Sequence, residues 1–320
     1  MIDEMNYYGK NHIPFLFIID FDILRPLIIP LADLHGGTIL YSINGITNHP
    51  VVDFNGKLPD VMLEKHPISY QEYKHMFDFI IKHQTNGNSY LLNLTCPTKI
   101  EINLSFIELY HRCIARYKLI YKDEFLVFSP ETFITIHEGL ISSHPMKGTI
   151  DAAIPDAESR ILNDEKEFSE HLTIVDLIRN DLNMVSTDVT VERFRYVEKV
   201  ITQDKELLQT SSMITGRLEK NYQNRIGSII KSLLPAGSVT GARKKMTLEL
   251  IHQAEKYERG YYTGIFGYFD GTNLDSGVMI RYMEKTNGCI YYKSGGGITV
   301  YSDPEMEYRE LIDKIYVPIN

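Results

Sequence analysis

The sequence has few of the residues that mark several common protein classes. Its three cysteines, Cys96, Cys113 and Cys289, are widely spaced and odd in number, which argues against a disulfide framework or a zinc knuckle. Basic residues are outnumbered by acidic ones, and the net charge of −9 is the opposite of what general nucleic-acid binding requires. The sequence also contains no His-Glu-x-x-His zinc motif, internal repeat or low-complexity tract.

Long apolar runs are lacking as well. The most apolar early stretch, residues 15–31, is interrupted by two aspartates, an arginine and two prolines, so we expect no membrane span. The first residues have neither the basic nor the apolar region of a signal peptide, and we expect a soluble cytoplasmic protein. At 320 residues, with 43% hydrophobic and 23% charged residues, the chain can bury an ordinary core. We expect one domain over residues 1–320, to which residues 1–65 contribute strands.

Capping signals predict where helices begin. Three segments combine a capping residue with a glutamate three positions later, ahead of apolar residues at helical spacing: Ser69 with Glu72, Ser105 with Glu108, and Asp164 with Glu167. We expect the third helix to run to about Asn180, with Leu172, Val175 and Ile178 facing inward. Residues 302–305, Ser-Asp-Pro-Glu, predict a further helix with proline in its first turn.

Short apolar segments between turn residues predict strands at 15–21, 27–31, 90–94, 125–128, 262–269, 278–283 and 289–293. Asp270-Gly271 and Asn287-Gly288 favour tight hairpin turns, so we expect the last three strands to form an antiparallel meander. Together these elements predict the α+β class, with a largely antiparallel β-sandwich core and helices packed outside it.

Two acidic pairs carry the first chemical signal. Glu167 and Glu170 lie three residues apart in one predicted helix, and Glu307 and Glu310 have the same spacing in another. This spacing places both carboxylates of a pair on one helix face. Most such pairs are only solvated helix surface, but four converging carboxylates would repel one another unless a hard cation such as Mg²⁺ neutralised them.

Arg281 and the run Gly295-Gly296-Gly297 indicate an anion site. Arg281 is the lone charge in a predicted strand, where it must pair or bind a ligand, and a structural ion pair is an equal alternative. Glycines let backbone amides approach an anion closely, although the run could also be a plain tight turn. Combined with the planar fork of an arginine, they suggest a substrate that carries a carboxylate.

Lys147 and Glu131 are candidate catalytic groups. Lys147 lies in a proline–glycine corner, where a desolvated lysine can lose its proton and act as a nucleophile, although most lysines are solvated surface residues. Glu131 follows Ser129-Pro130 at a strand end, and a carboxyl group there could act as a general acid. The segment 237–244, which looks like a phosphate-binding loop, has three residues between its glycines instead of four and alanine after the second, so it does not predict nucleotide binding.

These segments, in this order, resemble the chorismate-utilising enzymes, and among them the branch of aminodeoxychorismate synthase component I. The matching segments are Ser129-Pro-Glu131, Pro145-Met-Lys-Gly-Thr149, Glu170-His171, the run 175–182, the run 235–241, Arg281, Gly295–Gly297 and the run 302–310. They cover roughly residues 90–318. The lysine in Pro-x-Lys-Gly-Thr separates this branch from anthranilate synthases, which usually have alanine there.

The resemblance implies a chorismate-binding catalytic domain that converts chorismate and ammonia to 4-amino-4-deoxychorismate for para-aminobenzoate and folate synthesis. It implies that Mg²⁺ is bound by Glu170 and Glu310, with Glu167 and Glu307 supporting through water. Lys147 would attack C2 of chorismate while the C4 hydroxyl leaves with help from the metal and from Glu131 as acid. Ammonia would then add at C4 and expel the lysine. The residues implied to contact the substrate are Gly148, Thr149, Tyr262, Arg281, Gly295, Gly296, Gly297 and Lys314.

Some residues depart from the family pattern. Gln209 stands where relatives usually have histidine, and Leu91 stands where glutamine is common. Leu91 occupies the place where water-using relatives have a lysine base. The leucine therefore argues against isochorismate or salicylate synthesis. Most of the N-terminal segment where larger relatives bind tryptophan is missing, so we expect no tryptophan site. The sequence has no glutamine amidotransferase signature. We therefore expect a separate amidotransferase subunit to supply ammonia.

Two alternative functions remain open from the sequence. The chain could be an anthranilate synthase component I, which would form anthranilate from the same substrates. It could also be a non-catalytic chorismate-binding subunit whose Gln209 and Leu91 mark lost activity.

Overall fold

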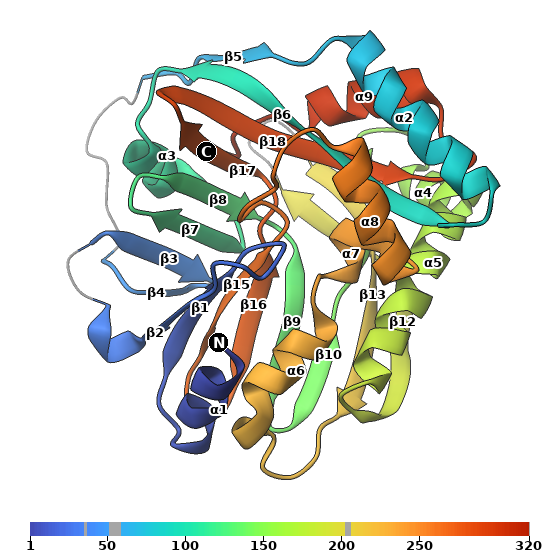
Figure 1. Ribbon diagram of the computed structural model, residues 1–320. Helices are drawn as coiled ribbons and strands as arrows, with labels where there is room; N and C mark the ends of the chain where they lie inside the picture. The colour runs from blue at the N-terminus through green and yellow to red at the C-terminus, as the bar shows by residue number, and fades with distance from the viewer. Residues whose placement is uncertain (35–36, 51–58, 202–205, 320) are drawn as a thin grey trace.

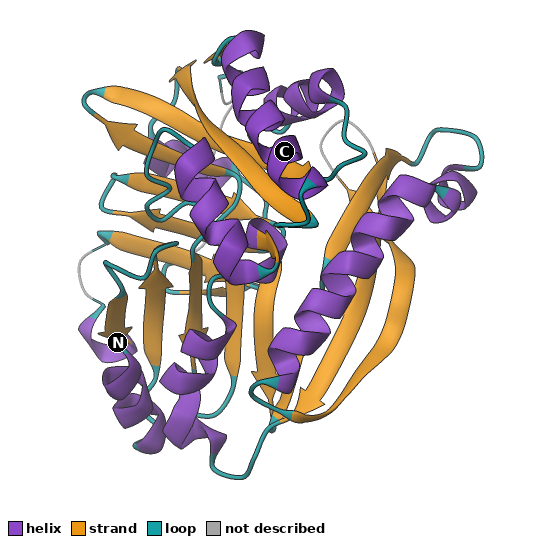
Figure 2. Cartoon of the chain, turned by 45° about the vertical axis from the view of Figure 1, so that its right-hand side comes forward, coloured by secondary structure: helices purple, strands orange, loops and turns teal. Residues whose placement is uncertain are grey.

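The computed structural model describes residues 1–34, 37–50, 59–201 and 206–319. All the strands in these residues belong to two large sheets (Figure 1). In the described part of the chain each sheet has nine strands, and neighbouring strands run antiparallel. Helices lie on the outer faces of the sheets (Figure 2). The expected α+β class with an antiparallel sandwich core is confirmed.

The order of the strands defines which segments meet. The first sheet contains, in spatial order, β11 (Met146–Asp151), β13 (Glu206–Arg217), β10 (Leu140–Ser143), β9 (Thr132–His137), β16 (Leu274–Val278), β15 (Ile265–Phe269), β1 (Phe15–Ile19) and β2 (Leu27–Pro30), with β12 (Thr187–Ile201) also paired to β13. The second contains β14 (Gly241–Ala242), β6 (Leu91–Ile102), β18 (Cys289–Ile298), β17 (Tyr282–Thr286), β8 (Phe125–Ser129), β7 (Tyr117–Tyr121), β3 (Ile39–Ile43) and β4 (Ile46–Thr47), with β5 (Leu63–His66) paired to β6.

Strand β1 shows why the two sheets pack together. All five of its residues are buried, and successive side chains of a strand point to opposite faces. Leu16 and Ile18 pack between the sheets with Phe266, Val127 and other apolar side chains, whereas alternate residues of β1 face the helices. Burying each such side chain contributes about 1.5–3 kcal/mol. A strand that is apolar on both faces therefore belongs in the middle of a layered fold.

The helices cover the outer faces of both sheets. On the first sheet lie α1 (Ile2–Lys10), α4 (Ala157–Asn163), α5 (Glu165–Asn183) and α6 (Ile226–Leu233). On the second lie α2 (Tyr70–Thr85), α3 (Phe106–Arg112), α8 (Lys244–Ala254) and α9 (Pro304–Asp313), and the short α7 (Gly237–Thr240) contacts both α5 and β6. In the described ranges the helices are all too short or too polar to cross a membrane.

The capping predictions are confirmed. Ser69 accepts a hydrogen bond from the Glu72 backbone N–H, and the Glu72 side chain accepts one from the Ser69 backbone N–H. Ser105 makes the same reciprocal pair at the start of α3, and Asp164 and Asp303 cap α5 and α9. The two helices that carry the acidic pairs therefore begin where local side-chain chemistry predicts.

The predicted strand 278–283 and the meander that contains it are wrong. Strand β16 ends at Val278 in the first sheet, β17 begins at Tyr282 in the second, and Arg281 between them has a φ of +53°. The two tight turns therefore close hairpins in two different sheets. A second crossing lies between β8 and β9, and the crossings are joined by backbone hydrogen bonds from Val278 to Glu131 and from Phe128 to Arg281.

One smaller expectation is wrong, and one alternative is excluded. Leu172 is 49% exposed, because the inward face of α5 is formed by His171, Ile174, Val175 and Ile178 at helical spacing. The triple-glycine run does not form a turn. It lies inside β18, where Gly295–Gly297 pair with residues 93–95 of β6.

A buried ion pair connects several of these elements. The guanidinium of Arg259 contacts Glu255 at 2.6 Å, and both side chains are 2% exposed. Arg259 also donates to the carbonyl oxygens of Val239 and Asn93, while Glu255 accepts from the backbone N–H of Thr95. Because each charged group has several partners, removing one leaves the others buried and unpaired.

We expect Arg259→Met to lower the free energy of unfolding by about 3–5 kcal/mol, because it leaves Glu255 as an uncompensated buried charge. The matched control is Arg309→Met, since Arg309 forms the same i,i+4 pair with Glu305 but both side chains are exposed. That control should cost less than about 1 kcal/mol. Urea unfolding followed by circular dichroism measures both, and equal losses would show that the buried pair has no special role.

Candidate active site

The two predicted acidic pairs lie on helices that pack on different sheets and meet in one region. Glu167 and Glu170 belong to α5, and Glu307 and Glu310 to α9. A side chain added at Gly296 would place its Cβ 3.3 Å from Glu307 Oε2 and 3.6 Å from Glu310 Oε1. The pKa of Glu167 is raised by burial and further by the negative charges of Glu170 and Glu310. The two acidic pairs are therefore close enough to interact electrostatically.

Lys147 lies between the two sheets. Its Nζ is 3.6 Å from Glu170 Oε2, and a Cβ added at Gly297 of β18 would be 3.3 Å from the same Nζ. Strand β11 has an irregular register between Lys147 and Thr149, and Gly148 there has a φ of +66°. A side chain at Gly148 would meet Glu167 Oε2 at 3.1 Å. The bare backbone of two glycines therefore makes room for the lysine and the carboxylates.

Glu131 follows the end of β8, as predicted, and lies in the crossing from β8 to β9. Burial raises its pKa, and this effect exceeds the opposing influence of a hydrogen bond from Ser238 and of the nearby charges of Lys147, Arg281 and Lys314. A carboxyl group that retains its proton at higher pH than usual, next to cations that can hold an anion, has the properties of a general acid.

Cationic groups gather near the other end of the glycine run. Lys314 donates to the carbonyl oxygen of Gly295 at 2.9 Å and pairs with Glu310 Oε1 at 2.6 Å. The guanidinium of Arg281 lies 5.1 Å from the centre of the Tyr316 ring, and within the described residues its buried Nε has no hydrogen-bond partner. An arginine nitrogen in that state is suited to an anionic ligand.

The remaining predicted contact residues differ in accessibility. Tyr262 is 3% exposed and packs between the sheets near Tyr282, and burial raises its pKa. Thr149 is exposed and pairs with Gln209 of β13. Gly295–Gly297 line the region through their backbone. The structure therefore brings the predicted lysine, acid, glycines and acidic pairs together, and leaves the Thr149 side chain facing solvent.

The four glutamates fit a hard divalent cation by their chemistry. They offer only oxygen donors, and Glu170 and Glu307 are 8% and 4% exposed. Among the described residues, these glutamates do not form a group of three whose oxygens all lie within 4.8 Å of one another. In the described ranges, three exposed residues have potential metal-ligand atoms within 4.8 Å of one another. They are Glu64 and His66 of β5 and Glu101 of β6, and no sequence motif points to them.

Two residues beside the site were also missed as functional candidates. Ser238 belongs to the segment that fails as a phosphate-binding loop, yet it hydrogen bonds to Glu131 from α7. Leu91 was noted only as a departure from a family pattern. A Cβ added at Gly297 would lie 3.0 Å from Leu91 Cδ1 and 3.3 Å from Lys147 Nζ, so Leu91 forms an apolar wall near the amine.

Comparison with known proteins agrees with this arrangement. Residues 53–320 match the family described as chorismate binding enzyme. The chain belongs to this family. It is 48% identical over 318 residues, 99% of this chain and 96% of the other, to a Haemophilus influenzae protein described as an uncharacterized PabA-like protein. It is 36% identical over 200 residues, 60% of this chain and 38% of the other, to anthranilate synthase component 1 of Mycobacterium bovis.

Solved structures of other proteins share the fold. The menaquinone-specific isochorismate synthase MenF of Escherichia coli superposes with a TM-score of 0.72 at 14% identity, over 98% of this chain and 79% of that one. Anthranilate synthase component I of Streptococcus pneumoniae gives a TM-score of 0.66 at 25% identity, over 81% and 59%. The predicted resemblance to chorismate-utilising enzymes is confirmed.

We expect Glu131→Gln to stabilise the metal-free protein at neutral pH. Because burial raises the pKa of Glu131 above its unfolded value, stability falls as pH rises through the folded pKa, where the buried carboxyl must ionise. Glutamine avoids that cost, so the gain should be present above the folded pKa and disappear below the ordinary carboxyl pKa. Urea unfolding at pH 4 and pH 8 measures it, with the exposed Glu124→Gln as control. A gain that is the same at both pH values would contradict the raised pKa.

Proposed function

We propose that this member of the chorismate binding family is an aminodeoxychorismate synthase component I, which aminates chorismate to 4-amino-4-deoxychorismate for para-aminobenzoate and folate synthesis. The observation that carries the proposal is the position of Lys147. Its amine lies between Glu170 of one sheet layer and the Gly297 backbone of the other, within electrostatic range of Glu131. The PabA-like description of the Haemophilus relative agrees with this pathway.

Chorismate carries two carboxylates, and the site offers cations and amides to receive them. Arg281 and Lys314 would bind the carboxylates together with the backbone of Gly295–Gly297. Tyr262 would support the same end from the layer between the sheets. This island of positive charge is necessary because the protein as a whole carries a net charge of −9.

The four glutamates would hold Mg²⁺, which prefers oxygen donors. Two of them, Glu170 and Glu307, are buried, and Glu310 is exposed. When bound, Mg²⁺ supplies positive charge that neutralises the carboxylates and stabilises charge that develops on an anionic substrate. The lysines that now pair with Glu170 and Glu310 lie at the edge of that set. Glu167 and Glu307 complete it from the same faces of α5 and α9.

The residues of the chain account for both halves of the reaction. The amine of Lys147 attacks C2 of chorismate, the ring double bonds shift, and the C4 hydroxyl leaves as water with the proton of Glu131. Ammonia then adds at C4, the double bonds shift back, and the C2–nitrogen bond to Lys147 breaks. Glu131 regains its proton from the incoming nitrogen. The apolar side chain of Leu91 helps to keep water away from the amine.

Ammonia would come from a separate glutamine amidotransferase subunit. The chain has no amidotransferase signature of its own, and none of its three cysteines lies in a glycine-rich nucleophile turn. Free ammonium should therefore replace the partner in vitro.

We expect the purified protein to form 4-amino-4-deoxychorismate from chorismate, ammonium and Mg²⁺, and Lys147→Ala to lose at least about 100-fold of this activity. Chromatography with mass spectrometry identifies the product. Without ammonium, acid-quenched protein should carry a lysine adduct of chorismate minus water on the Lys147 peptide. Lys199→Ala, an exposed lysine, is the control. A fluorescent anthranilate product would favour an anthranilate synthase, and undiminished turnover by Lys147→Ala would refute the covalent role.

We also expect Glu170→Gln to weaken Mg²⁺ binding by on the order of 10- to 100-fold, because it removes a charged oxygen ligand. Isothermal titration calorimetry with Mg²⁺ alone measures this. Glu64→Gln is the matched control, since it alters the exposed Glu64, His66 and Glu101 set. If only the Glu64 variant loses affinity, the metal site lies on β5 and β6 instead.

A further inference from the structure

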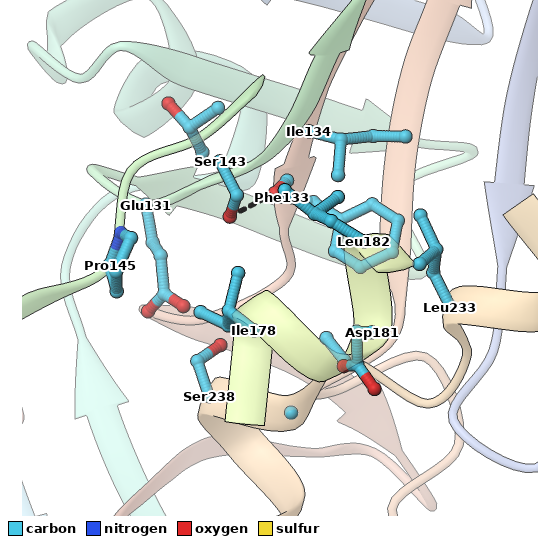
Figure 3. A pocket seen from close by; sticks show the side chains of 13 residues that line it. Glu131, Phe133, Ile134, Ser143, Pro145, Ile178, Asp181, Leu182, Leu233 and Ser238 are labelled. Atoms are coloured by element: carbon cyan, nitrogen blue, oxygen red, sulfur yellow. Dashed lines mark hydrogen bonds between the residues drawn. The ribbon is translucent and has the colours of Figure 1, made fainter. Parts of the chain in front are cut away.

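A small cavity adjoins the side chain of Glu131 and has no role in the reaction derived above. Its volume is about 20 Å³. Polar residues that line it include Glu131, Ser238, Asp181 and Ser143, and its apolar side chains include Ile178 and Leu182. Figure 3 shows the Glu131 carboxyl group and the Ser238 hydroxyl pointing toward each other among the residues that line the cavity. A water molecule requires about 10–15 Å³ of such space, so the cavity holds one and not two.

The polar groups around the cavity match what a buried water needs. A buried water makes two to four hydrogen bonds, and Glu131, Ser238 and Asp181 can supply them. The charge of Asp181 is balanced, because its Oδ2 lies 2.6 Å from Nζ of Lys244, which also donates to the carbonyl oxygen of Leu233. The apolar walls disfavour an ion, since a charge without a partner is costly to bury.

We propose that this cavity is a binding site for one water molecule that donates a hydrogen bond to Glu131 and stabilises Glu131 after it has given up its proton. The proposal rests on the proposed function in that Glu131 is taken as the acid. When the C4 hydroxyl leaves, the proton moves from Glu131 to the departing oxygen, and a buried carboxylate remains. A water O–H that donates to that carboxylate strengthens the ionised state. The proton returns when ammonia adds, so the water is not consumed.

The surroundings of Glu131 are consistent with this role. Lys147 of β11, Arg281 of the crossing and Lys314 at the end of α9 act on it electrostatically, Ser238 of α7 hydrogen bonds to it, and Asp181 of α5 lies across the cavity. The cations would be occupied by the substrate during the reaction. The substrate does not displace the water, which therefore remains as a hydrogen-bond donor to the Glu131 carboxylate.

Ser143 provides a test that leaves the named catalytic groups intact. Its side chain lines the cavity and donates to the carbonyl oxygen of Phe133 at 3.0 Å. Ser143→Thr keeps that hydroxyl and adds a methyl group, which is enough to fill a cavity of about one water volume. Ser143→Ala removes the hydroxyl and adds nothing, so it is the matched control.

A high-resolution crystal structure of the unaltered protein should show an ordered water within hydrogen-bond distance of Glu131, retained in Ser143→Ala and displaced in Ser143→Thr. In the ammonium-dependent assay, Ser143→Thr should lower kcat about tenfold, with the KM values for chorismate and ammonium within about twofold. Loss of a donor to the carboxylate raises the pKa of Glu131, so the alkaline fall of activity should move to higher pH.

An absent water, or a Ser143→Thr variant with unchanged kcat and pH profile, overturns the proposal. A raised KM for ammonium with an unmoved pH profile also overturns it, because the cavity would then serve ammonia. If the unaltered protein makes no aminodeoxychorismate, the proposed function fails, while the crystal structures still decide whether the water site exists. Thermal unfolding of both variants checks that they are folded.

Discussion

The buried contact between Arg259 and Glu255 fixes the backbone on which the candidate site is built. Arg259 binds the carbonyl oxygen of Asn93, and Glu255 binds the N–H of Thr95, so both act on the segment of β6 that pairs with Gly295–Gly297. The same guanidinium binds Val239 in the short helix that carries Ser238. The buried Arg259–Glu255 pair thus positions both the backbone next to Gly295–Gly297 and the helix that carries Ser238. Loss of either charge would leave the other buried and without its partner, so the pair constrains the arrangement of these segments.

A second constraint is the balance of charge between the two layers. Each acidic pair comes from a helix that packs on a different sheet, and each has a lysine against one of its members. The lysines lower the repulsion that would otherwise oppose bringing the two helices together. The proposed reaction gives both lysines a second role. Lys147 would be the nucleophile, and Lys314 would bind a carboxylate of the substrate. The electrostatic needs of the fold and of the proposed reaction are therefore met by the same residues.

Local signals in the sequence predict the starts of helices well. They do not predict the segments where the chain passes from one sheet to the other. The capping boxes of Ser69 and Ser105 are confirmed because all their partners lie within three residues. The strand expected over 278–283 is wrong because alternation cannot reveal that a chain leaves one sheet for another at Arg281. The acidic pairs were recognised from their spacing, but their meeting depended on the resemblance to a known family. Ser238 was overlooked because its partner Glu131 is more than a hundred residues away and no local pattern links them.

The hydrogen bonds between the two crossings have a mechanical consequence. Residues 128–131 and 278–281 pass from sheet to sheet side by side, and the bonds from Val278 to Glu131 and from Phe128 to Arg281 join them into one ribbon. A small rotation of one sheet against the other about this ribbon would change the distance between α5 and α9, while the spacing of Glu131 and Arg281 stayed constant. The two crossings therefore fix Glu131 and Arg281 relative to each other independently of the helices that carry the acidic pairs.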